Sequence, residues 1–145
     1  MFGVVNPDEG WARTRFAQAR VARLATASTD SAPHLVPITF AVVGDMIVSA
    51  VDHKPKSTTR LRRLANIAAN PRVSVLVDAY DEDWTQLWWA RADGLARVVT
   101  EGSGFAAAVD ALVLRYPQYR EASPAGPVVV VEVSRWSGWA ATPPQ

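Results

Sequence analysis

The chain has 145 residues, a length typical of one domain, with 49% hydrophobic residues, 20% charged residues and a formal net charge of +1. This near-neutral balance gives no overall field that would attract nucleic acid or an acidic membrane, and no apolar run is long enough to span one. There is no cysteine, which excludes disulfides, thiolate catalysis and sulfur-ligated metal sites. The first residues lack the basic and apolar runs of a signal peptide, so we expect a cytoplasmic protein.

Three segments have the periodicity of helices. Their apolar residues recur at the spacing of one helix face, over residues 7–20, 57–70 and 105–116. The first begins with a capping box in which Asn6 is the cap, Pro7 the first helical residue and Glu9 the third. In the second, the face expected to meet the core consists of Leu61, Leu64, Ala65 and Ala68.

Six segments have the pattern of β-strands, over residues 21–28, 34–43, 46–51, 73–77, 86–100 and 128–133. Gly44-Asp45 is a hairpin signal, Gly94 indicates a bulge, and the residues from Trp136 onward are predicted as a tail. Hairpin signals replace the regular strand–helix alternation of a parallel sheet. We therefore predict one α+β domain over residues 1–145, a mostly antiparallel barrel flanked by helices.

The basic segment 54–63 is the strongest local signal for binding. Lys54 and Lys56 are the only lysines of the chain and precede Ser57. If Ser57 caps the second helix, Arg60 lies in its first turn, where the helix dipole disfavours a cation. Free N–H groups, hydroxyl groups and flexible ammonium groups together suit a phosphate or a carboxylate. The segment therefore predicts an anion site, with a solvated basic face as the alternative.

The aromatic and imidazole side chains provide the other candidates. Trp88 and Trp89 point to opposite faces of one predicted strand, so we expect the barrel interior on one side and a partner subunit or planar ligand on the other. The two histidines lack the spacing of a metal site, and His34 is expected to be structural. An anion site and aromatic walls without an acid–base constellation suit chemistry carried by a phosphorylated cofactor. No residue is assigned a catalytic role.

The order of these elements resembles the split-barrel flavin and deazaflavin oxidoreductases, the superfamily of pyridoxamine-phosphate oxidase. The resemblance extends from about Asp8 to Trp139, and its most specific motifs are NPRVSVLVD (70–78) and DWTQLWWARADG (83–94). The second motif looks like a subgroup of coenzyme F420-dependent enzymes. The resemblance implies a six-stranded antiparallel split β-barrel of the FMN-binding type, which forms a homodimer with cofactor sites at the interface.

The resemblance also implies which residues bind the cofactor. Those along the flat ring would be Val36, Pro37, Ile38, Ala50 and Val51. Those at the phosphate or the polyglutamate tail of F420 would belong to the basic segment, namely Lys54, Pro55, Lys56, Ser57 and Arg60. Trp88 and Trp139 are our candidates for the walls of an acceptor pocket.

The expected function is a reductase that uses reduced F420 and transfers a hydride to a flat, conjugated small molecule. One alternative is an FMN- or haem-binding protein of the same fold. A second alternative, of a different class, is a non-enzymatic protein that grips nucleic acid with its basic residues between 54 and 72.

Overall fold

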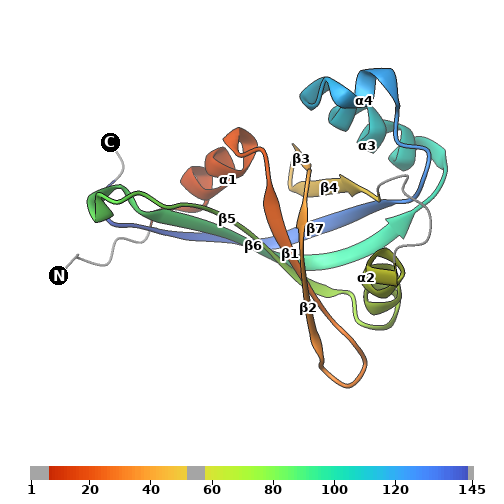
Figure 1. The fold of residues 1–145 in the computed structure, drawn as a ribbon, viewed down its shortest axis with the longest axis horizontal. Coiled ribbons are helices and arrows are strands. Elements are labelled where there is room, and N and C mark those ends of the chain that lie inside the picture. The colour runs from red at the N-terminus through yellow and green to blue at the C-terminus, as the bar shows by residue number, and fades with distance from the viewer. Residues whose placement is uncertain (1–6, 52–57, 144–145) are drawn as a thin grey trace.

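The computed structural model describes residues 7–51 and 58–143, with residues 58–61 described by their backbone alone. Its elements in chain order are α1 (Glu9–Gln18), β1 (Ala22–Ala27), β2 (Pro33–Ile38), β3 (Ala41–Val43), β4 (Met46–Ala50), α2 (Thr58–Ala69), β5 (Arg72–Ala79), a short 3-10 turn η1 (Trp84–Gln86), β6 (Trp88–Val99), α3 (Gly102–Arg115), α4 (Gln118–Glu121) and β7 (Val128–Ala140) (Figure 1). Among the described residues, no helix is both long enough and apolar enough to cross a membrane.

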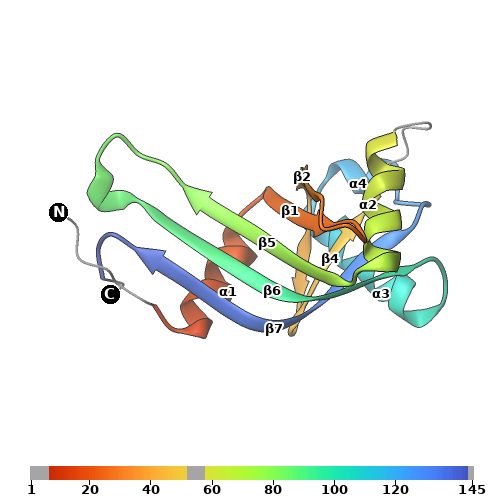
Figure 2. The same ribbon diagram turned by 90° about the horizontal axis from the view of Figure 1, so that it is seen from below.

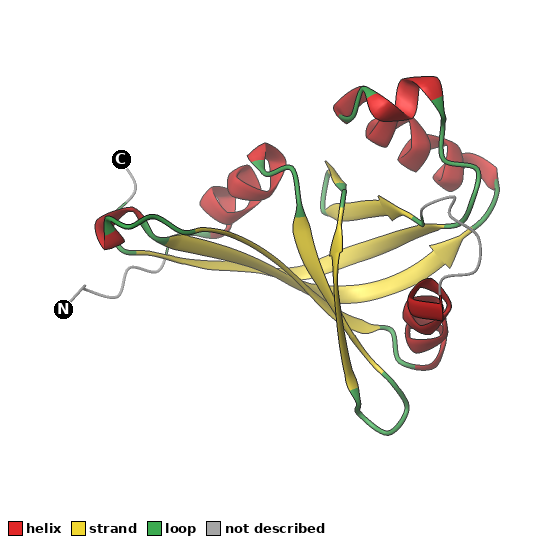
Figure 3. Cartoon of the chain, in the orientation of Figure 1, coloured by secondary structure: helices red, strands yellow, loops and turns green. Residues whose placement is uncertain are grey.

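The strands form one seven-stranded antiparallel sheet in the order β2-β1-β5-β6-β7-β4-β3. Its two edge strands, β2 and β3, follow each other along the chain, so the sheet curls until its edges approach at Thr39 and Phe40 (Figure 3). The interior of this curl is filled mainly by valine, alanine and aromatic side chains under α1. A second apolar cluster lies between α3 and the strands β3, β4 and β7. The predicted α+β, antiparallel barrel is therefore confirmed.

The strand count differs from the predicted six because residues 34–43 form two strands. The chain leaves β2 after Ile38 and enters β3 at Ala41. Between them, Phe40 is fully buried, and both its N–H and its carbonyl oxygen are hydrogen-bonded to the Tyr116 hydroxyl. At this corner, the Tyr116 side chain at the end of α3 therefore takes the place of a neighbouring strand as the hydrogen-bond partner of the backbone.

The predicted tail after Trp136 is wrong, because β7 continues to Ala140 and pairs with β6 as far as Trp88. The predicted irregularity at Gly94 is confirmed by a shift of the β6–β7 register between Asp93 and Gly94. A Cβ added to Gly94 would lie 2.2 Å from the carbonyl oxygen of Glu132, so only glycine lets the strands approach so closely. The extra residue opposite it lies in β7, where the polar pair Ser134-Arg135 interrupts the apolar pattern.

Two helix predictions need correction. The cap of α1 is Asp8, two residues after the predicted cap, and its carboxylate accepts a hydrogen bond from the Trp11 N–H at 2.9 Å. Because the third helical residue is then Trp11 instead of Glu9, the predicted capping box is wrong. In α2, Ala65 and Ala68 are exposed, and the buried side chains are those of Arg63, Asn66 and Ile67. The helix is rotated from the predicted face because it packs on β1 and β6 (Figure 2), where Asn66 donates a hydrogen bond to the Thr26 hydroxyl at 3.0 Å.

Candidate functional site

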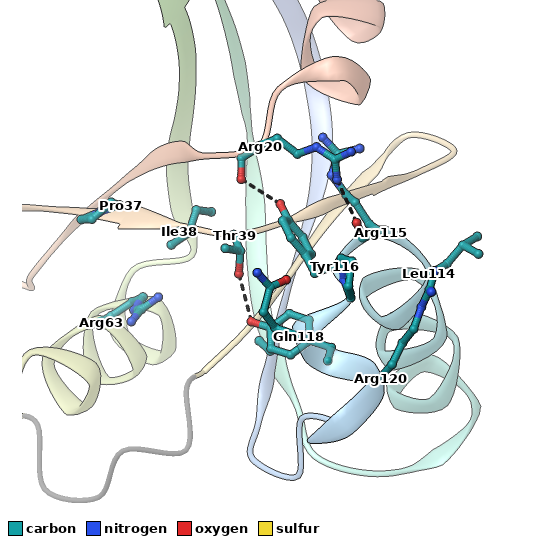
Figure 4. Close-up of a pocket in the computed structure, with 13 residues that line it drawn as sticks. Arg20, Pro37, Ile38, Thr39, Arg63, Leu114, Arg115, Tyr116, Gln118 and Arg120 are labelled. Atoms are coloured by element: carbon teal, nitrogen blue, oxygen red, sulfur yellow. Dashed lines mark hydrogen bonds between the residues drawn. The ribbon is translucent and has the colours of Figure 1, made fainter.

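A cleft of about 990 Å³ opens where β2 turns into β3, between α2 on one side and the end of α3 with α4 on the other (Figure 4). Its apolar lining includes Pro37, Ile38 and Ala50. Its cationic lining consists of Arg20, Arg63, Arg115 and Arg120, and none of the described lining residues is acidic. The volume lies within the range of cofactor and ligand pockets. Four cations without a carboxylate suit an anionic ligand with a flat apolar part.

Two tyrosines fix the far wall of this cleft to its floor. The Tyr116 hydroxyl accepts a hydrogen bond from the Phe40 N–H at 3.0 Å and lies 2.9 Å from the carbonyl oxygen of Arg20. The Tyr119 hydroxyl is hydrogen-bonded to the Thr39 hydroxyl at 3.0 Å. The two tyrosine rings meet edge to face, with centroids 5.7 Å apart. The end of α3 is therefore held against the β2–β3 corner by polar and aromatic contacts together.

Three of the predicted cofactor residues meet in the cleft. Pro37, Ile38 and Ala50 come from two strands that are not neighbours in the sheet, and the curl of the sheet brings them together. Val36 and Val51 belong to the apolar core instead. Lys54, Pro55, Lys56 and Ser57 lie outside the described residues, and for Arg60 only the backbone within α2 is described. Their predicted roles remain predictions.

Arg63 belongs to the basic segment 54–63 but was not among the residues predicted to bind the cofactor. It is only 8% exposed and lies in the wall that α2 contributes to the cleft. The positions 63, 66 and 67 have helical spacing, but two of them are polar, so an apolar pattern could not indicate them. Arg20, Arg115 and Arg120 were also missed. They join the cleft from segments far away in the sequence, and no local motif marks them.

Trp88 and Trp139, predicted to line one acceptor pocket, lie on opposite faces of the sheet. Trp88 packs edge to face against Trp11 of α1 with ring centroids 6.0 Å apart, and the Arg15 guanidinium lies 4.7 Å from the Trp88 ring. Trp139 is instead paired with Trp89 on the neighbouring strand, facing away from α1. Neither lines the cleft. Within one chain, these two side chains cannot border the same pocket.

The amino-acid sequence of the chain identifies its family. The family model described as pyridoxamine 5'-phosphate oxidase matches residues 11–140, which include every strand of the sheet. The chain belongs to the pyridoxamine 5'-phosphate oxidase family. The match begins within α1 and ends at the last residue of β7.

Solved structures have the fold of this pyridoxamine 5'-phosphate oxidase family member over nearly its whole length. An FAD-binding protein from Mesorhizobium loti is 20% identical, with a TM-score of 0.72 over 94% of this chain and 96% of that one. An FAD-binding protein from Mycobacterium smegmatis is 19% identical, with a TM-score of 0.68 over 92% and 97%. A haem-binding protein from Mycobacterium smegmatis is 26% identical, with a TM-score of 0.73 over 95% of this chain and 56% of that one. No curated protein matches the chain.

His34 lies on β2, outside the lining of the cleft, and of the cleft cations Arg63 acts on it. Burial lowers the pKa of its imidazole below 6.5, and the charges of Arg62 and Arg63 lower the pKa further. Its Nδ1 atom is buried without a hydrogen-bond partner. A neutral imidazole is therefore favoured, which agrees with the predicted structural role but does not test it. Within residues 7–51 and 58–143, no cluster of three or more histidine or acidic side chains could hold a metal ion.

Proposed function

We propose that the protein is an oxidoreductase that binds reduced coenzyme F420 in the cleft and reduces a flat, conjugated small molecule. The observation that carries this proposal is the combination of an apolar floor with four arginines, with no acid among the lining residues that the structure describes. A deazaflavin with a phosphate-bearing side chain has both features that such a lining recognises, a flat ring and several negative charges. The family and the likeness to FAD-binding proteins support a cofactor of the flavin type.

Each part of the lining has a distinct role in this proposal. Pro37, Ile38 and Ala50 contact the ring system, and Arg63 faces the phosphate. Lys54 and Lys56 directly precede α2, the helix that carries Arg63, in the sequence. We propose that Lys54, Lys56 and Ser57, with Arg60, bind the phosphate or the anionic tail.

When bound, reduced F420 supplies a hydride, and the protein has to position the acceptor and limit the access of water. Pro37, Ile38 and Ala50 of the apolar floor would support the flat ring, and the tyrosine contacts at the β2–β3 corner fix the opposite wall. No histidine or acidic side chain lines the cleft as described. The proton that accompanies the hydride is therefore proposed to come from solvent.

A second candidate function is the binding of FMN, FAD or haem by the same cleft. The likeness to a haem-binding protein from Mycobacterium smegmatis, at 26% identity, is the reason to include haem among the candidate cofactors. A haem iron is commonly held by histidine; no histidine is among the described residues that line the cleft, and His53 lies outside the described residues. The likeness to two FAD-binding proteins weighs toward a flavin-type cofactor. The net charge of +1 weighs against the nucleic-acid alternative.

We also propose that the protein is a homodimer, joined through the face of β5, β6 and β7 that points away from α1. This outer face carries Leu76, Trp89, Arg91 and Trp139, all of them half-buried in the single chain. Figure 1 shows α1 on one side of the left-hand part of these strands and no described helix on the other side of that part, since α2 lies farther to the right. A large aromatic face without a cover is typical of a protein–protein interface. In the dimer, Trp139 would face the partner subunit.

Titration of the purified protein with F420, FMN and haem in turn tests the cofactor assignment. Cofactor fluorescence reports the first two and the Soret band reports haem. We expect saturable binding of F420 that is tighter than binding of FMN or haem. Tight FMN or haem binding without affinity for F420 would overturn the assignment, and no binding of any of the three would overturn the proposed function.

A further inference from the structure

A second cavity, of about 400 Å³, lies on the side of the sheet that α1 covers. It is bordered by α1, by η1 with the start of β6, and by the end of β7 with the residues that follow it. Figure 1 shows α1 toward one end of the extended strands, with α3 and α4 toward the other. The cavity shares no described lining residue with the cleft at the β2–β3 corner, so it is a separate candidate site.

Arg15 is the one charged side chain among the described residues that line this cavity. Its guanidinium carbon lies 5.1 Å from the centre of the Trp11 ring and 4.7 Å from that of Trp88. Within the parts of the chain that the structure describes, the Arg15 side chain forms no hydrogen bond and no ion pair. Its unpaired nitrogen atoms are not buried, so a ligand can reach them. Two aromatic rings thus hold a cation whose N–H groups are available to an anion.

Most of the other hydrogen-bond donors around the cavity are used within the protein. The Thr142 hydroxyl donates to the Thr85 carbonyl oxygen at 2.6 Å, and the Thr85 hydroxyl donates to the Asp83 carboxylate at 2.7 Å. Gln86 is exposed at the rim, and its amide makes only a long hydrogen bond of 3.4 Å to the Thr85 hydroxyl. The donors left for a ligand are therefore one guanidinium and one amide.

We infer that this cavity binds a small aromatic monocarboxylate at a site separate from the cleft. The Arg15 guanidinium would bind the carboxylate through paired hydrogen bonds, with the Gln86 amide beside it. The aromatic part would lie against Leu87, Trp88 and Pro143. A single cation balances the one charge of a carboxylate, whereas a phosphate dianion would keep one charge unpaired. The inference does not depend on which cofactor the cleft binds.

Titration of the ¹⁵N-labelled protein with simple probes, followed by nuclear magnetic resonance, tests this inference. The probes are benzoate, the uncharged benzamide of the same shape, and phenyl phosphate. The indole N–H resonances of Trp11 and Trp88 report the cavity, and that of Trp89 on the opposite face of the sheet is the internal reference. Because the parent protein alone locates the ligand, the test does not depend on the stability of any variant.

The variant is Arg15→Met, which removes the charge and keeps an apolar stem against the two indoles. The matched control is Arg13→Met on the same helix, since the Arg13 guanidinium also lies over a tryptophan, 5.3 Å from the Trp136 ring, but does not line the cavity.

We expect benzoate to shift the Trp11 and Trp88 resonances but not that of Trp89. Affinities read from these shifts should be about tenfold higher for benzoate than for benzamide, and phenyl phosphate should bind no more tightly than benzoate. Arg15→Met should abolish the preference for benzoate, and Arg13→Met should preserve it. Equal affinity for benzoate and benzamide, tighter binding of phenyl phosphate, shifts that bypass Trp11 and Trp88, or an unchanged preference in Arg15→Met would each overturn the inference.

Discussion

The hydroxyl of Tyr116 is hydrogen-bonded to both backbone groups of Phe40, at 3.0 Å from its nitrogen and 2.9 Å from its carbonyl oxygen. One side chain at the end of α3 therefore closes the corner at which the sheet curls from β2 to β3. The cleft is built on this corner, since Thr39 and Tyr116 both line it.

Tyr116→Phe is expected to lower the free energy of unfolding by about 1–3 kcal/mol, because it leaves buried backbone groups of Phe40 without a partner. Urea denaturation followed by far-UV circular dichroism measures the change. Tyr119→Phe is the matched control, since it removes one hydrogen bond to a side-chain hydroxyl and should cost less. Equal stability of the two variants would contradict the importance of the Tyr116 contact.

Gly138→Ala is expected to destabilise the protein by about 1–3 kcal/mol through overpacking. An added Cβ would lie 2.6 Å from Cζ3 of Trp11 and 2.9 Å from the carbonyl oxygen of Trp89. In Gly104→Ala, the control on α3, the added Cβ meets nothing within 4 Å, so stability should be unchanged or higher. Thermal unfolding of both variants decides the matter, and a Gly138→Ala protein as stable as the parent would show that β7 is not packed against α1 as described.

Trp88→Ala is expected to lower stability by roughly 3 kcal/mol, because this side chain packs on Trp11 and against Arg15. Within one chain Trp88 lies outside the cleft, so the affinity for the cofactor should change little in the folded fraction. Chemical denaturation and cofactor titration of the same preparation separate the two effects. A large loss of cofactor affinity at unchanged stability would place Trp88 in a site shared between subunits.

The stability of the protein should depend on the protonation of His34. Its pKa is lowered in the folded state by burial and by the charges of Arg62 and Arg63. Below the ordinary pKa of 6.5 the unfolded chain therefore binds the proton more readily than the folded one, and stability falls as the pH falls through this window. Comparison of the parent with His34→Gln at pH 7.5 and pH 5.5 should show a smaller pH dependence in the variant. Identical pH dependence would exclude the imidazole as its source.

Substitution on the outer face tests the proposed dimer. Trp139→Glu should convert a dimer into a monomer, because it places a charge in an aromatic face that the proposed partner covers. Leu114→Glu is the control, since this side chain is already 80% exposed on α3, away from the outer face. Sedimentation velocity at micromolar concentration gives the result. A monomeric parent protein would rule out the dimer directly.

The sequence was sufficient for the elements whose signals are local. Alternating valines marked β5, and Gly94 marked the irregularity of the β6–β7 pair. The continuation of β7 past Trp136 was missed because the bulge interrupts the alternation with Ser134 and Arg135, two polar residues in succession. The reason is physical, since a bulge shifts every later side chain relative to the simple period of two.

The candidate site was predictable only in part, because tertiary packing decides which side chains reach it. Pro37, Ile38 and Ala50 were found through the family resemblance, and the curl of the sheet brings them together. Arg63 and Arg115 reach the same cleft from helices whose rotation is set by packing against the sheet. An arginine in a helix looks like a solvated residue until the tertiary contact is known.

The dissociation constant of F420 for the parent protein and for the double variant Lys54→Ala, Lys56→Ala tests the central claim most directly. If the basic segment and the cleft form one site, loss of two charge-assisted contacts should weaken binding by about 2–4 kcal/mol while the circular dichroism spectrum stays unchanged. A double variant that binds F420 as tightly as the parent would contradict the claim that the two lysines serve a cofactor.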